Sequence, residues 1–146
     1  MQSKLPSSGT RSSCPVNAAV EVIGDQWTLL ILRDMLLQER CRFSEFRGSE
    51  ESVATNILAT RLKHLATHGL IEKFKDPEDG RGALYFPTER ALDFIPVLVA
   101  TMAWSNTHQP ETTKYAPLMA AYRSDPHGTA EGLKERARQF RKKVLP

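Results

Sequence analysis

The chain has 146 residues, of which 40% are hydrophobic and 25% charged, a balance typical of one folded domain with an appendage. Two cysteines are too few for a disulfide framework. The net charge of +3 is uneven, because residues 129–146 carry six Lys/Arg and two Asp/Glu, whereas the first 128 residues carry 14 and 15. The excess of basic residues therefore lies at the C-terminal end, and the net charge is no evidence that the rest of the chain binds nucleic acid.

Several protein classes are disfavoured by what the sequence lacks. The N-terminal residues contain no apolar core, so we expect no secretion signal, and no apolar run approaches the length of a membrane span. We therefore expect a cytoplasmic protein. The sequence offers no nucleophile–base pair, metal-ligand spacing or phosphate-binding loop, so we expect neither an enzyme nor a metal or cofactor site.

The predicted elements begin after a polar segment. Residues 1–13 are predicted to form a disordered N-terminal arm. Pro15 suits the first turn of a short helix that Gly24 would end. Asp25 is then placed to cap a helix over residues 26–38 that is apolar on nearly every side. Such a helix must be buried on most sides, and part of it could meet a second subunit.

A short strand is predicted at 41–43, and Ser44 is predicted to cap a stub helix. Residues 54–68 then form an amphipathic helix, because Leu58, Leu62 and Leu65 share one face at helical spacing. The opposite face carries short hydrogen-bonding groups and one cation, namely Asn56, Thr60, Lys63 and Thr67. These groups suit base edges and phosphates, although a solvated helix face without acids would look the same.

A hairpin is predicted directly after this helix. Gly69 suits a left-handed helix end, residues 70–75 alternate like a half-buried strand, and residues 83–86 form the return strand. The loop between them holds Arg81, which could reach a minor groove or a phosphate. The acids beside it favour a plain exposed hairpin equally. A polar-faced helix followed by such a hairpin is the back half of a winged helix-turn-helix.

The last third of the chain is predicted to be helical. Thr88 would cap a long apolar helix running to about residue 104, with a kink at Pro96. Residues 105–114 read as a linker and 115–122 as a short helix. Thr129 would cap a final helix with one apolar and one cationic face. That helix could fold back on the core, extend a dimer interface, or add nonspecific phosphate contacts.

These segments resemble the HxlR-type family of bacterial winged helix-turn-helix regulators. The matching runs are CPVNAAVEVIGDQWTLLILRDML, RFSEF, ATNILATRLKHLATHGLIEK, Tyr85 and LDFIPVLVATMAW, in order over roughly residues 14–104. The resemblance implies a homodimer that binds operator DNA through the helix at 54–68, with terminal helices at the dimer contact. It also implies that some members sense electrophiles or oxidants through a cysteine at the position of Cys14. The tail from about Tyr115 lies outside the shared pattern.

The overall prediction is a mainly α fold with a small β-hairpin (α+β), namely a winged helix-turn-helix with extra terminal helices. We expect an arm at 1–13, a DNA-binding domain with dimerisation helices at 14–104, and a linker with a C-terminal helical extension at 105–146. The expected partner is double-stranded DNA with an inverted-repeat operator, bound by a homodimer that could also take a small-molecule effector. The alternative is a winged-helix protein-interaction module without DNA binding.

The predicted DNA contacts follow from the helix face and the loop. They are Thr55, Asn56, Thr60, Arg61, Lys63 and Arg81. Arg61 lies nearer the apolar side and could instead pair with an internal acid. Cys14 precedes a helix N-terminus, whose partial positive charge favours the reactive thiolate, so it is a candidate sensor. The alternative is a small residue packed beneath the first helix. Cys41 is expected to be packed.

Overall fold

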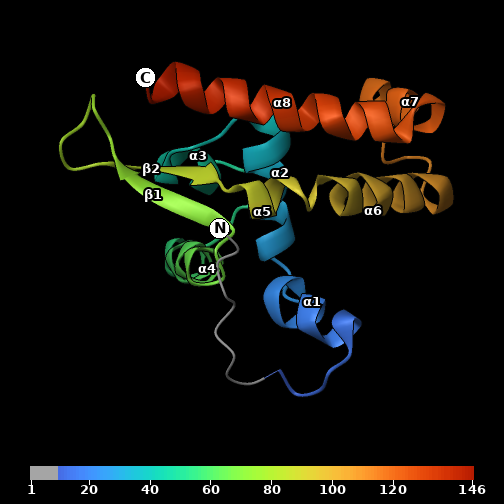
Figure 1. The fold of residues 1–146 in the computed structure, drawn as a ribbon, viewed down its shortest axis with the longest axis horizontal. Coiled ribbons are helices and arrows are strands. Elements are labelled where there is room, and N and C mark those ends of the chain that lie inside the picture. Colours follow the sequence, from blue (N-terminus) through green and yellow to red (C-terminus); the bar gives the residue numbers. More distant parts are fainter. Residues whose placement is uncertain (1–9) are drawn as a thin grey trace. The chain divides into compact units, whose positions relative to one another are not determined.

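The fold is mainly helical, with a single antiparallel hairpin among the described residues, as the sequence predicted (Figure 1). The computed structural model describes residues 10–146. They divide into two compact units between Ala91 and Leu92. The elements of the first unit are α1 (Pro15–Ile23), α2 (Thr28–Gln38), α3 (Phe43–Arg47), α4 (Thr55–Thr67), β1 (Ile71–Lys75) and β2 (Ala83–Pro87). α5 (Glu89–Leu92) spans the division, and the second unit holds α6 (Ile95–His108), α7 (Ala116–Ser124) and α8 (Pro126–Val144). No helix within residues 10–146 combines the length and apolar character needed to cross a bilayer.

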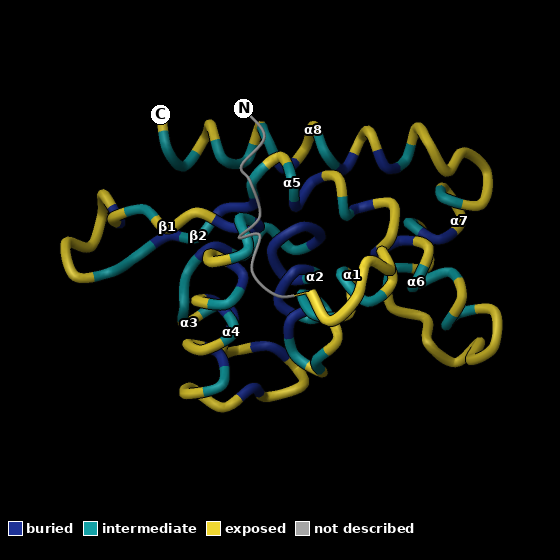
Figure 2. The backbone as a smooth tube through the Cα atoms, turned by 60° about the horizontal axis from the view of Figure 1, so that its bottom comes forward, coloured by how far each residue is buried: buried dark blue, intermediate teal, exposed yellow. Residues whose placement is uncertain are grey.

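Helix α2 is the centre of the first unit. Seven of its residues are buried, and it packs against α1, α4 and β2 (Figure 2). Trp27, not Asp25, is the N-cap residue, but the Asp25 carboxylate accepts hydrogen bonds from the backbone N–H groups of Trp27 at 2.8 Å and Thr28 at 2.9 Å in the turn before the helix. Satisfying these donors starts the helix at Thr28, two residues later than predicted.

The segment before α3 differs from the prediction. No strand forms at 41–43; only one isolated bridge pairs Arg42 with Leu84. Ser44 is not the cap, because α3 already begins at Phe43 and Arg42 holds the extended conformation of an N-cap. The Arg42 backbone N–H donates to the Glu45 carboxylate at 3.2 Å, which satisfies the entry to the helix without a serine hydroxyl.

Helix α4 ends in a Schellman motif, which confirms the role predicted for Gly69. Gly69 has φ 71°, its N–H donates to the Ala66 carbonyl, and the Leu70 N–H donates to the Leu65 carbonyl. Leu65 and Leu70 are both buried. The chain thus turns directly from α4 into β1, which pairs with β2 in the register Ile71↔Pro87 to Lys75↔Ala83.

Three predictions for the second unit need correction. A long helix kinked at Pro96 does not form, because α5 and α6 are separate helices and Pro96 lies in the first turn of α6, where no N–H partner is needed. The predicted linker starts later, since α6 continues to His108. Asp125, not Thr129, caps α8: its carboxylate accepts from the Gly128 N–H at 2.9 Å. Thr88 does cap α5, at 3.4 Å from the Ala91 N–H.

Candidate nucleic-acid interface

Helix α4 presents two chemically different faces. Leu58, Leu62 and Leu65 are buried in the first unit. On the other side, Asn56, Thr60 and Lys63 are exposed. The Thr60 hydroxyl donates to the Asn56 carbonyl at 2.9 Å, which fixes its rotamer and leaves its oxygen able to accept. Within residues 10–146, the Asn56 amide and the Lys63 ammonium have no protein partner, so both remain available to a ligand.

The other two predicted residues of α4 differ from each other. Thr55 is the first helical residue and is exposed. Arg61 is partly buried, and its Nε lies 3.5 Å from the Asp25 carboxylate, so it pairs with an internal acid. Burial opposes the charge on Asp25, but hydrogen bonds from Thr28 and Trp27 hold the pKa of this carboxyl below its usual value. Arg61 therefore ties α4 to the start of α2.

A polar network fixes the turn that precedes α4. Arg33 donates to both oxygens of Glu51 at 2.8 Å and to one oxygen of the buried Asp34 at 2.6 and 2.9 Å. The pKa of Arg33 is raised mainly by its hydrogen bonds to Glu51. Burial raises the pKa of Asp34 despite the neighbouring cation. The segment leading into α4 is thus bound to α2 through a charged pair that sequence spacing did not reveal.

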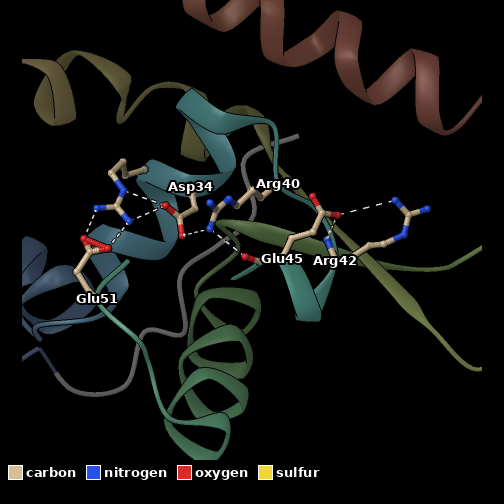
Figure 3. Close-up of polar contacts among 6 residues, drawn as sticks. Asp34, Arg40, Arg42, Glu45 and Glu51 are labelled. Atoms are coloured by element: carbon tan, nitrogen blue, oxygen red, sulfur yellow. Dashed lines mark hydrogen bonds and ion pairs between the residues drawn. The ribbon is translucent and has the colours of Figure 1, made fainter. Parts of the chain in front are cut away.

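The same network continues to α3 (Figure 3). Arg40 lies 3.5 Å from the second Asp34 oxygen and donates to the Glu45 carbonyl at 2.9 Å. Asp34 consequently contacts cations on both sides, and Arg40 connects the end of α2 to α3. These contacts orient the elements around α4 but leave its exposed face uncovered.

The hairpin, which we call the wing (residues 71–87), is anchored to Arg42 at the point where its loop begins, directly after β1. Asp76 is buried; its carboxylate accepts from Arg42 Nε at 3.1 Å and from the Glu78 backbone N–H at 2.9 Å. The hydrogen bond from that N–H, together with Arg42, lowers the pKa of Asp76. Arg42 also lies 3.4 Å from Glu78, so two wing acids are neutralised. Arg81 is exposed near the tip of the wing and belongs to a different segment of the chain from the predicted contacts on α4.

A histidine pair joins α4 to α1. His64 Nε2 lies 2.8 Å from the Val22 carbonyl, at the end of α1, so the ring serves as a hydrogen-bond donor there. The His68 ring lies 4.5 Å from the His64 ring, and its buried Nδ1 has no hydrogen-bond partner within the described part of the chain. Burial, His64 and Arg90 together lower the pKa of His68. No local sequence pattern indicated this contact.

The two cysteines have opposite environments. Cys14 is exposed and is the N-cap residue of α1, immediately before Pro15. It is not packed beneath the helix, the alternative considered from the sequence. Cys41 is buried as predicted, and burial raises the pKa of its thiol to about 11. Residues 10–146 hold no group of three or more His, Cys, Asp or Glu side chains suited to a metal ion.

Three helices (α1, α2 and α3), followed by α4 with an exposed polar face and then by a β-hairpin, define a winged helix-turn-helix protein. The sequence profile of the HxlR-like helix-turn-helix family matches residues 22–113. The chain belongs to this family of transcriptional regulators.

Individual relatives agree with this assignment. The HTH-type transcriptional regulator sll1512 of Synechocystis sp. is 31% identical over 60% of this chain and 64% of its own length. A regulator of Methanothermobacter thermautotrophicus is 32% identical over 71% of this chain and 81% of its own length. The alignment thus covers slightly less than two thirds of the first relative.

Solved structures support the fold. The crystal structure of PA1607, a candidate transcription factor, has a TM-score of 0.62 and 37% identity, covering 68% of each chain. The reduced form of the transcriptional regulator YodB from B. subtilis has a TM-score of 0.54 and 27% identity, covering 65% of this chain and 93% of that one. Both are similar to this chain in fold and sequence.

Proposed function

We propose that the chain is a homodimeric, sequence-specific DNA-binding regulator that places α4 in the major groove and the wing beside it. One observation carries the proposal: on the side of α4 opposite its buried leucines, Asn56 and Lys63 lie exposed, with no side-chain partner among residues 10–146. Asn can pair bidentately with adenine, and Lys can neutralise a phosphate. Thr55 and Thr60 lie exposed on the same helix and extend this surface.

The remaining predicted contacts have unequal roles. Arg81 is exposed, and with Asp76 and Glu78 paired to Arg42 it is free to approach the DNA backbone or a minor groove. Arg61 acts indirectly, because its contact with Asp25 sets the orientation of α4. Family membership supports DNA as the ligand of this surface.

Dimer formation is supported by an apolar face of α1 that the described residues 10–146 leave uncovered. α1 has the sequence PVNAAVEVI and no buried residue, with Val16 68% and Val20 48% exposed. Burying such a face against a second copy removes apolar surface from water. In the second unit, Val97 and Trp104 on α6 are likewise exposed. V16E/V20E is expected to convert a dimer to a monomer in light scattering after size exclusion. An unchanged mass would reject α1 as the contact.

The DNA-binding experiment compares single variants by fluorescence anisotropy, on the DNA upstream of the coding sequence and on a random duplex of equal length. N56A should weaken specific binding by roughly 1–3 kcal/mol and relax sequence preference. K63Q should weaken both duplexes alike and reduce the salt slope by about one. Lys114→Gln, an exposed cation of the second unit, is the matched control. Absence of binding to any duplex, or tolerance of N56A, would favour the protein-interaction alternative.

A symmetric dimer predicts an inverted-repeat operator with half-sites about one helical turn, roughly 34–36 Å, apart. Cleavage protection that covers a single, asymmetric half-site would contradict this arrangement.

We also propose Cys14 as the sensor of electrophiles or oxidants. Its exposure and its place as the N-cap residue of α1 support the assignment, since a reagent can reach the thiol directly. Val22, near the other end of α1, contacts His64 of α4, so modification at one end of the helix has a route to the DNA-binding surface. Mass spectrometry of oxidant-treated protein should find Cys14 modified and Cys41 intact. A C14S variant that still loses DNA binding on oxidation would end the idea.

A further inference from the structure

The last two turns of α8 form a continuous basic segment. Within residues 136–143 there are five cations and no acid, and the last acid of the chain is Glu135. The five cations of this segment, which we call the α8 basic segment, are Arg136, Arg138, Arg141, Lys142 and Lys143.

All of the net positive charge of the protein lies in this segment. The first 135 residues carry 15 Lys/Arg and 17 Asp/Glu. The part of the chain up to Ala91, which holds α4 and the wing, is balanced with 12 of each. Many of its arginines are held by acids, as in the pairs Arg33–Glu51 and Arg42–Asp76. The unit that holds the proposed reading surface therefore has no net positive charge, although Lys63 and Arg81 are exposed on it.

The cations of α8 differ in whether an acidic side chain of the protein pairs with them. Lys134, just before the segment, lies 3.4 Å from Asp93 and 3.3 Å from Glu131. Lys142 and Lys143, in contrast, are exposed and have no protein partner within residues 10–146. Both ammonium groups are therefore available to an external anion.

The apolar face of α8 is already used. Ala130, Leu133 and Ala137 are buried, and the helix packs against α6 and α7 within the second unit (Figure 2). An amphipathic helix binds a bilayer by inserting its apolar face, which is not available here. What α8 offers is a cluster of positive charge on a folded helix, and that favours a polyanion in solution over a lipid surface.

We propose that the α8 basic segment binds DNA phosphates, outside the bases read by α4, through Lys142 and Lys143. This inference rests on the proposed function for its choice of polyanion. Each lysine placed at a phosphate releases condensed counterions, which gives binding energy that is independent of sequence and falls with salt. The extension thereby supplies the electrostatic attraction that the charge-balanced first unit lacks.

The test is DNA affinity over a salt series for the full chain and K142Q/K143Q, on the upstream duplex and on the random duplex. The slope of log affinity against log salt should fall by about two per protomer, equally on both duplexes. At about 0.1 M salt, affinity should drop at least tenfold for both. K143Q alone should give about half the change in slope. K142R/K143R, which keeps the charge, should behave as the parent protein, and K114Q should leave the slope unchanged.

The outcomes separate this inference from the proposed function. If N56A relaxes sequence preference while K142Q/K143Q keeps the parent slope, the α8 inference is overturned and the proposed function stands. If K142Q/K143Q abolishes binding that N56A leaves unaffected, the inference stands and sequence reading by α4 fails. Absence of DNA binding by the parent protein overturns both.

Two other roles of these lysines have their own signatures. Cations near a helix C-terminus also stabilise the helix, so thermal unfolding is measured on every variant. A lowered melting temperature with an unchanged salt slope would assign a structural role and overturn the inference. Vesicles containing phosphatidylserine serve as the second probe: loss of vesicle binding in K142Q/K143Q with an unchanged DNA slope would overturn it in favour of a membrane.

Discussion

Replacing Arg33 with Met should destabilise the first unit mainly through Asp34. Asp34 is 2% exposed and would lose the hydrogen bonds at 2.6 and 2.9 Å. Removing one partner of a buried ion pair costs about 3–5 kcal/mol. Since Arg40 remains 3.5 Å away, we expect the lower end, about 3 kcal/mol at pH 7. The contact with Glu51, whose side chain is 34% exposed, adds no more than about 1 kcal/mol.

The loss should depend on pH in a defined direction. Burial already raises the pKa of Asp34, and removing Arg33 raises it further. The folded state then keeps a proton that the unfolded state has released, so stability falls as pH rises through the folded pKa. The loss of stability in R33M should therefore be smaller at pH 5 than at pH 7, and the double variant R33M/D34N should recover part of that loss.

The measurement is urea unfolding followed by circular dichroism at both pH values. R47M, which removes an exposed arginine of α3, is the matched control and should cost less than about 1 kcal/mol. A deficit for R33M no larger than that of R47M, or one equal at the two pH values, would refute the view that a buried, cation-dependent carboxylate holds this part of the fold.

Three further outcomes are expected. G69A should lower the stability by about 1 kcal/mol, because a side chain is strained at φ 71°; an unchanged urea midpoint would contradict this. The lowered pKa of His68 means that the unfolded state takes up its proton first, so stability should fall as pH drops below about 6.5 and H68Q should flatten that dependence. Iodoacetamide at pH 8 should alkylate native Cys14 and spare Cys41, whose pKa is about 11; equal labelling would refute the burial of Cys41.

Local sequence rules predicted the elements whose ends depend on nearby residues. Gly69 was predicted to end α4 because only the residues around it decide a left-handed helix end. The prediction that Ser44 caps α3 was wrong, because the Glu45 carboxylate accepts from the backbone N–H of Arg42 and Ser44 lies inside the helix. Pro96 was read as a kink, but a proline is equally suited to begin a helix, and the packing of two separate helices decides between these outcomes.

The candidate site, too, was predictable only where nearby residues decide the structure. Helical periodicity alone separated the leucine side of α4 from Asn56 and Lys63. The residues that position α4 could not be found this way, because their partners are distant in sequence. Arg33 and Glu51 are 18 residues apart, and Arg42 bonds a side chain 34 residues away. Only the folded chain brings such charges together.

Thr88 has a consequence for how the first unit meets any ligand. Its N–H donates to the Leu70 carbonyl at 3.0 Å and its hydroxyl to the Gly69 carbonyl at 2.6 Å, so the end of β2 is fixed to the turn between α4 and β1. The helix and the hairpin consequently keep a constant separation before any encounter. A preorganised pair loses little configurational entropy on association, and a DNA whose groove geometry does not match that separation would have to deform to bind.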